Sequence, residues 1–119
     1  MGVLELGCVG GTPGVCRLGD TLMFTINGNL MSGFLGAYAE RVGEPSAPRI
    51  WYFPTANGTA PRLEARSGTL VVPQGVRLGP PHAPGQYRVT MWIAEAPPGR
   101  AEPQSMALGR ESLPLEILP

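Results

Sequence analysis

The segment Gln86–Ala94 alternates between two sets of side chains, and this alternation constrains the fold more than any other feature of the sequence. The first set is apolar and consists of Tyr87, Val89, Met91 and Ile93. The second set falls on the opposite face and consists of Arg88, Thr90, Trp92 and Ala94. A period of two residues is typical of a β-strand that packs one face on a core. Thr21–Ile26 repeats the pattern, so the sequence predicts a sheet with one buried face.

Glycine and proline separate the apolar runs along the chain. The 119 residues include 17 glycines and 14 prolines, and proline bounds strands because it cannot donate a hydrogen bond to a central ladder. Asn27-Gly28 predicts a hairpin turn, since both residues tolerate positive φ. Pro114 predicts that the last strand is an edge strand or begins after it. The runs predicted to be strands are Val3–Cys8, Thr21–Ile26, Gly33–Glu40, Arg49–Phe53, Thr69–Val72, Val76–Leu78, Gln86–Ala94 and Leu113–Leu118.

Helical periodicity is absent from every long stretch of the chain. One short helical turn is expected over Glu102–Leu108, in the connection before the last strand. Several short strands with turn signals at regular spacing predict a β-sandwich or a small barrel. A chain of this length forms one core, so residues 1–119 are expected to be a single domain.

Cys8 and Cys16 bracket a glycine-rich loop that can fold back and bring the two sulfurs together. A disulfide across so short a loop would stabilise the fold by roughly 2–3 kcal/mol. Disulfides persist in oxidising compartments, so this reading predicts an extracytoplasmic location, the periplasm or the cell surface. The alternative is a pair of buried free thiols, because cysteine packs as a small hydrophobe.

The charge pattern excludes several classes of partner. Net charge is zero, and all nine basic residues are arginines spread from Arg17 to Arg110 without a cluster. Nucleic-acid binding needs a basic patch and is not expected. The apolar runs are too short to span a bilayer, so no direct membrane insertion is expected. No signal-peptide pattern follows Met1, and the early first strand suggests a start at a domain boundary.

The residues that carry chemistry are too few to predict an enzyme. His82 is the single histidine and Asp20 the single aspartate, and nothing in the sequence brings them to a nucleophile. A zinc site needs about four ligands, which one histidine and two cysteines do not supply. No phosphate-binding loop or nucleophile elbow occurs. We therefore expect no catalytic activity, no metal and no cofactor, and the sequence does not identify a small-molecule ligand.

The most aromatic segment is Arg49–Phe53, which is followed by Pro54. In a regular strand Ile50 and Tyr52 share one face, while Trp51 and Phe53 share the other. Both faces are then apolar, which suits a strand covered on both sides. The functional alternative is an exposed aromatic surface for a sugar ring or a peptide, formed by Trp51, Phe53 and Trp92.

Four segments carry a resemblance to a known family: Leu18-Gly19-Asp20, Ser32–Tyr38, Arg49–Pro54 and Pro84–Val89. Their order resembles an uncharacterised bacterial immunoglobulin-like accessory domain that occurs C-terminal to anti-sigma zinc-finger or caspase-like domains. The resemblance covers roughly residues 18–95. It implies an all-β, immunoglobulin-like β-sandwich of about seven to eight strands, an accessory or sensor role, and an extracytoplasmic position. It brings no catalytic residues.

Three functions are compatible with these patterns. The first is a non-catalytic protein-interaction or sensor module of a larger extracytoplasmic bacterial protein, with a protein partner or neighbouring domains of the same chain. The second is a structural or assembly subunit of a surface or secretion complex, because low charge and long loops suit a domain packed among neighbours. The third is a carbohydrate-binding module that uses the aromatic side chains.

Overall fold

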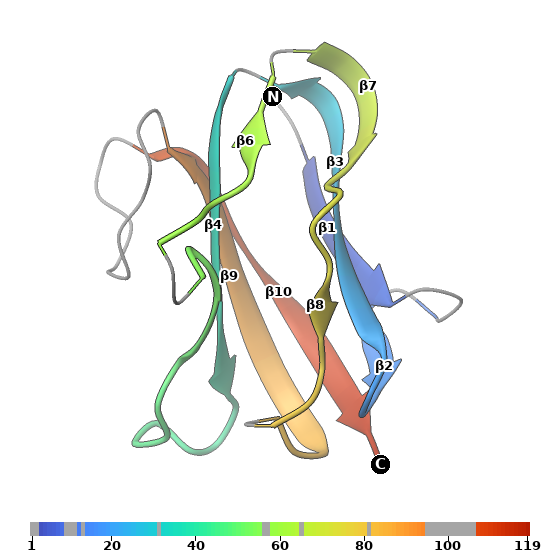
Figure 1. The fold of residues 1–119 in the computed structure, drawn as a ribbon. Coiled ribbons are helices and arrows are strands. Elements are labelled where there is room, and N and C mark those ends of the chain that lie inside the picture. Colours follow the sequence, from blue (N-terminus) through green and yellow to red (C-terminus); the bar gives the residue numbers. More distant parts are fainter. Residues whose placement is uncertain are drawn as a thin grey trace.

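In the computed structural model the regular structure is entirely β-strand, as the alternation predicted. The structure describes residues 3–8, 12, 14–30, 32–55, 58–64, 66–80, 82–94 and 107–119. These residues form two sheets, an arrangement compatible with a β-sandwich (Figure 1).

The first sheet is built around β3 (Thr21–Leu30). β1 (Val3–Cys8) pairs with one edge of β3 in antiparallel orientation. β7 (Arg66–Val71) and β8 (Val76–Arg77) follow one another along the opposite edge, also antiparallel. β1 is therefore an edge strand, with β3 as its only partner among the described residues.

The second sheet has the order β2-β10-β9-β4-β5, and β6 also pairs with β4. All its pairings are antiparallel except that of β2 with β10, which is parallel. The chain thus passes from β1 in the first sheet to β2 in the second. The strands are β2 (Val15–Arg17), β4 (Gly33–Arg41), β5 (Ile50–Phe53), β6 (Arg62–Leu63), β9 (Gly85–Ala94) and β10 (Ala107–Leu118).

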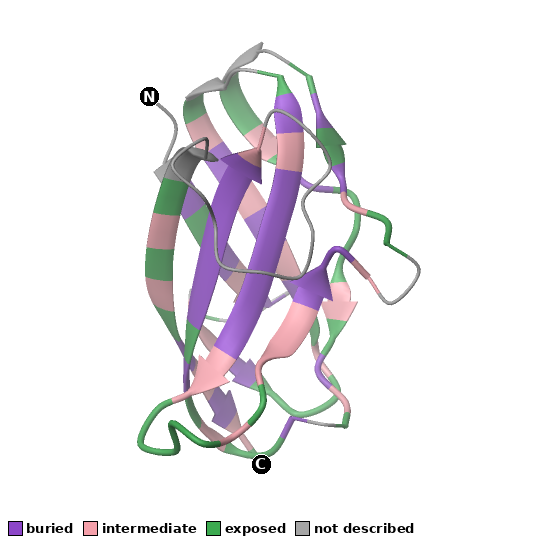
Figure 2. Ribbon diagram, turned by 90° about the vertical axis from the view of Figure 1, so that its left-hand side faces the viewer, coloured by how far each residue is buried: buried purple, intermediate pink, exposed green. Residues whose placement is uncertain are grey.

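The core lies between the two sheets and confirms the predicted alternation. From β3 it takes Leu22, Phe24 and Ile26, none of which is more than 1% exposed. From β9 it takes Tyr87, Val89, Met91 and Ile93. The central strands of the second sheet are also buried on their outer face, which is seen in Figure 2. None of the described residues belongs to a helix that could cross a bilayer.

The hairpin turn predicted at Asn27-Gly28 is wrong. β3 continues through both residues to Leu30, and Gly28 pairs with Gly68 of β7. Gly28 has φ 102° and Gly68 has φ 98°. The positive φ that suggested a turn therefore occurs inside a strand pair. Both facing residues are glycines, which adopt a positive φ without the steric cost that a side chain would bring.

β10 runs through Pro114 without a break, so the prediction that the strand begins after this residue is wrong. Glu116 N–H donates to the carbonyl of Gly14, on the β2 side of the strand. Backbone groups alternate along a strand, so the nitrogen of Pro114 faces the same side. β2 pairs only with residues 116–118, so no described strand pairs with this side of β10 at Pro114, as proline requires. Of the helical turn expected over 102–108, residues 102–106 lie outside the described part of the chain, and β10 begins at Ala107.

Candidate functional site

The disulfide between Cys8 and Cys16 is present, as the spacing predicted. Cys8 ends β1 in the first sheet, and Cys16 lies in β2 in the second sheet. Their Cα atoms are 5.6 Å apart. The bond therefore ties the two sheets together at the point where the chain changes sheet. Both side chains are buried in the core.

Two of the three aromatic residues predicted as a binding surface meet on the outer face of the second sheet. The ring centroids of Trp51 and Trp92 are 6.0 Å apart, in an edge-to-face arrangement. Tyr38 of β4 completes the cluster, 5.0 Å from Trp51 and 5.9 Å from Trp92. The guanidinium of Arg49 lies 4.3 Å from the centre of the Tyr38 ring and pairs with Glu40 at 3.6 Å.

Burial leaves this aromatic cluster little surface for a ligand. Trp92 is 3% exposed and Tyr38 is 1% exposed, whereas Trp51 is half-buried. The large rings pack on one another and gain the edge-to-face energy that aromatic pairs give a core. Among the three predicted residues, Trp51 alone presents part of its ring to solvent.

Phe53 does not share a face with Trp51, so the predicted alternation of this segment is wrong. The pairing of β5 with β4 shifts register between Ala37 and Tyr38. Such a shift places two consecutive residues of one strand opposite one residue of its partner and re-aims their side chains. Tyr52 and Phe53 both enter the core, where the Phe24 ring lies 6.0 Å from Tyr52 and 5.4 Å from Phe53.

Gly36 makes the packing of Trp92 possible. A Cβ atom at residue 36 would lie 2.4 Å from the Trp92 ring. We expect Gly36→Ala to lower the free energy of unfolding by about 1–3 kcal/mol, because the indole must move. Gly79→Ala is the matched control, since a Cβ there meets nothing within 4 Å. Denaturant unfolding measures both variants, and equal losses would contradict the role of Gly36.

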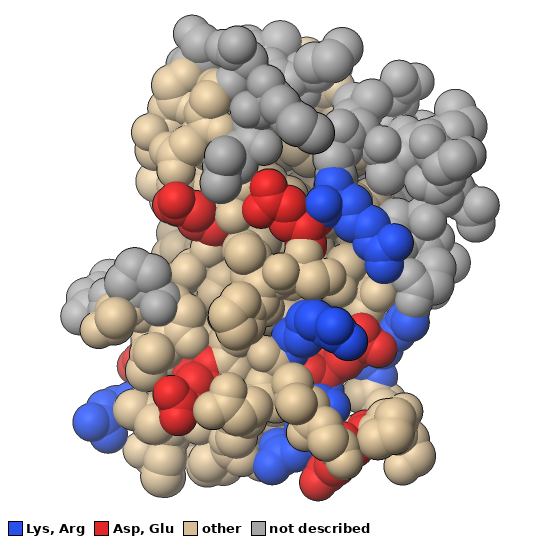
Figure 3. Space-filling view, turned by 180° about the vertical axis from the view of Figure 1, so that it is seen from behind, with Lys and Arg blue, Asp and Glu red and all other residues tan. Residues whose placement is uncertain are grey.

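A groove of about 500 Å³ opens along the seam between the two sheets, on the side of β1 and β10. Its apolar lining includes Leu4, Leu6, Cys8, Met23, Leu113 and Pro114. Among the described residues of the lining, Glu5 alone is charged, and it is exposed. In the view from behind, an uncharged surface lies between side chains of both signs, with carboxylates above it and arginines along one side (Figure 3). The sequence predicted β1 as a strand but gave no sign that a groove would form beside it.

His82 is a buried structural residue and not a solvated turn residue. Its Nδ1–H donates to the carbonyl of Gly79 at 2.9 Å, because a carbonyl can only accept. Nε2 of the neutral ring then accepts from the Tyr52 hydroxyl at 2.8 Å. Burial raises the pKa of Tyr52, and the nearby Tyr87 adds to the effect. Burial also lowers the pKa of His82, against a smaller opposing contribution from its hydrogen bond to Gly79.

Stability should fall as the pH drops below the ordinary histidine range. Because the pKa of His82 in the folded chain lies below the ordinary histidine value of 6.5, the unfolded chain binds the proton more readily. Its stabilising contribution is complete above pH 6.5 and is lost as the pH falls through the folded pKa. Urea unfolding between neutral and mildly acidic pH measures this slope. The same slope in His82→Gln would contradict the assignment to His82.

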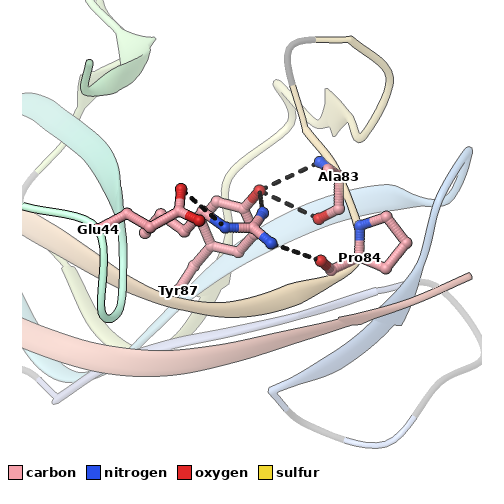
Figure 4. A network of polar contacts seen from close by, with 5 residues as sticks. Glu44, Ala83, Pro84 and Tyr87 are labelled. Carbon is pink, nitrogen blue, oxygen red and sulfur yellow. Dashed lines mark hydrogen bonds and ion pairs between the residues drawn. The ribbon is translucent and has the colours of Figure 1, made fainter. Parts of the chain in front are cut away.

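A second polar network holds the turn before β9 (Figure 4). The Tyr87 hydroxyl accepts from the N–H of Ala83 at 3.1 Å and donates to its carbonyl at 3.0 Å. Arg41 donates to this hydroxyl at 2.9 Å and to the carbonyl of Pro84 at 2.9 Å. Glu44 pairs with Arg41 at 3.3 Å. The start of β9 is thus fixed to the end of β4 by a tyrosine and an arginine.

In the part of the chain that the structure describes, no three histidine, cysteine or carboxylate side chains come together as a metal site. The structure brings together Trp51 and Trp92, separates Phe53 from them, and opens a groove that the sequence did not predict. In comparisons with known proteins, no family model matches this chain, and no curated protein matches it.

Proposed function

We propose that this chain is a non-catalytic protein-interaction module of a larger extracytoplasmic protein, built on an immunoglobulin-like β-sandwich. The observation that carries the proposal is the groove between β1 and β10, whose described lining is apolar apart from the Glu5 carboxylate and a few polar groups. Within this lining Met23, Leu113 and Pro114 are partly or fully exposed, and exposed apolar surface beside polar groups is typical of sites for partners. Its volume of about 500 Å³ lies in the range of binding pockets.

Two observations support the immunoglobulin-like assignment. The sheet orders β1-β3-β7 and β10-β9-β4-β5 correspond to the A-B-E and G-F-C-C′ strands of such domains. The hydroxyl of Tyr87 bonds to the backbone of Ala83, four positions upstream, at the start of a central strand. This is the geometry of a tyrosine corner. The disulfide departs from the immunoglobulin pattern, because it joins β1 to β2 and not the B and F strands.

The disulfide also supports the proposed location, since such bonds persist outside the reducing cytoplasm. A bacterial parent protein, with this domain in an accessory or sensor position, is the setting that the resemblance over residues 18–95 suggests. In that setting, neighbouring domains of the same chain are candidate partners beside a separate protein.

The carbohydrate-binding alternative has less support. Sugar-binding surfaces need aromatic faces open to solvent, and Phe53 and Trp92 are each 3% exposed. The assembly alternative finds some support in Val42 and Val71, which are 60% and 53% exposed.

Tryptophan fluorescence and size measurements separate these functions. We expect a pool of random short peptides to bind with little change in the fluorescence of Trp51. Trp51 lies on the outer face of the second sheet, whereas the groove lies at the seam between the two sheets. Simple sugars and oligosaccharides should leave the fluorescence unchanged. Saturable quenching by a sugar would favour the carbohydrate module, and a defined large oligomer in solution would favour the assembly subunit. Failure of the whole peptide pool to bind would contradict the proposed function.

A further inference from the structure

Among the described residues, β1 has no partner along the edge away from β3, and the backbone groups of that edge point toward the seam. Val72 N–H donates to the carbonyl of Phe24 at 2.8 Å, so the even-numbered residues of β3 face β7 and the odd-numbered ones face β1. Glu5 and Gly7 pair with the odd-numbered residues Thr25 and Met23 and exchange hydrogen bonds with them. Backbone groups alternate along a strand, so those of Leu4, Leu6 and Cys8 point away from β3.

The facing edge of β10 is a poorer template for an added strand. β2 covers only residues 116–118 of this edge. Pro114 precedes these residues and directs a nitrogen that carries no hydrogen toward the same side of β10. Proline is one of the residues that block edge pairing. β1 contains no proline between Val3 and Cys8. Of the two edges at the seam, β1 therefore offers the continuous row of donors and acceptors.

We infer that the edge of β1 is a docking site for an extended peptide segment, which adds to the first sheet as a strand beside β1. This inference rests on the proposed interaction function and specifies its site and partner. Unpaired N–H and C=O groups beside an apolar groove are complementary to an extended backbone with apolar side chains at alternate positions. The edge from Leu4 to Cys8 is about 17 Å long at about 3.3 Å per residue.

The charge of the groove adds one element of specificity. Of the described residues that line the groove, Glu5 alone is charged; it is exposed and makes no ion pair with another described residue. A basic side chain on the docked segment, opposite Glu5, would complete an ion pair there. The partner is therefore an extended segment that alternates apolar and polar residues and carries one arginine or lysine.

The probe is a short acetylated and amidated peptide of alternating valine and threonine with a central arginine. Two further versions carry N-methyl groups on alternate amides, one on the set that would face β1 and one on the set that would face solvent. We expect the first to bind about tenfold or more weakly than the parent peptide, because each lost hydrogen bond leaves a buried carbonyl unpaired. The second should bind within about threefold of the parent. Equal binding of the two versions, or no binding of the parent peptide, would overturn the inference.

Charge reversal at the rim gives a second readout on the intact protein. We expect Glu5→Lys to weaken binding of the parent peptide roughly three- to tenfold, since it replaces an attraction with a repulsion at a solvent-exposed site. Glu64→Lys is the control, because Glu64 is exposed and directly follows β6 of the other sheet. Equal effects of the two substitutions would overturn the role of Glu5.

A free protein that sediments as a dimer would instead assign the β1 edge to a second copy of the chain. Binding of random peptides without any of these effects would overturn this inference and leave the interaction function standing.

Discussion

Replacing Phe24 with alanine should lower the free energy of unfolding by about 3–5 kcal/mol. Phe24 is 1% exposed at the centre of β3, and its ring contacts both aromatic residues that β5 sends into the core. The substitution removes the ring and leaves a cavity between the two sheets, so the lost transfer energy and the cavity add. Total stabilities of about 5–15 kcal/mol are usual for single domains, so the loss is a large part of the whole. Urea unfolding followed by fluorescence measures it.

Val71→Ala is the control for Phe24→Ala. Val71 lies on β7 of the same sheet and is 53% exposed, so its truncation should change the free energy of unfolding by no more than about 0.5 kcal/mol. A loss below about 1 kcal/mol for Phe24→Ala would contradict a core that is closed between the two sheets at this point.

Removing the disulfide should cost about 2–3 kcal/mol, as loop-closure entropy predicts for a short loop. The double variant Cys8→Ala/Cys16→Ala tests this, because alanine leaves no new polar group in a buried site. We expect its melting temperature to fall by on the order of 10 °C. The cost arises in the unfolded chain, which the bond holds more compact, and in the loss of the tie between β1 and β2.

Reduction of the unchanged protein is the matched experiment. A reducing agent should lower the melting temperature of the natural chain toward that of the double variant and should leave the double variant unchanged. Equal melting temperatures for the oxidised and the reduced natural chain would contradict a stabilising role for the disulfide. Thiol titration under denaturing conditions without reductant tests the bond itself. Two free thiols in protein made under oxidising conditions would contradict the disulfide.

The sequence predicted the strands whose side chains alternate in period two. Val3–Cys8 has the predicted bounds, and β9 differs from its prediction by one residue. This succeeds because alternation records directly which face packs on the core. β2 and β6 were not predicted, since strands of three and two residues are too short to alternate. The equally short β8 was predicted as Val76–Leu78, because glycine and proline bound its apolar run. The hairpin predicted at Asn27-Gly28 failed because positive φ occurs in turns and also within paired strands.

The candidate sites were predicted only in part, for a related reason. The disulfide followed from spacing along the chain, which is a local property. The fate of Phe53 depended on a register shift between β4 and β5, which no local pattern records. The groove depends on the two edges that β1 and β10 leave free, and these edges follow from the order of strands in both sheets.

The most direct test of an interaction function through β1 is an amide NMR titration of the intact protein with the valine-threonine-arginine peptide. We expect the largest shift changes to fall on the amides of Leu4, Leu6 and Cys8 and on neighbouring groups of β10, and the indole signals of Trp51 and Trp92 to stay in place. Shift changes centred on those indoles, with β1 unaffected, would contradict it.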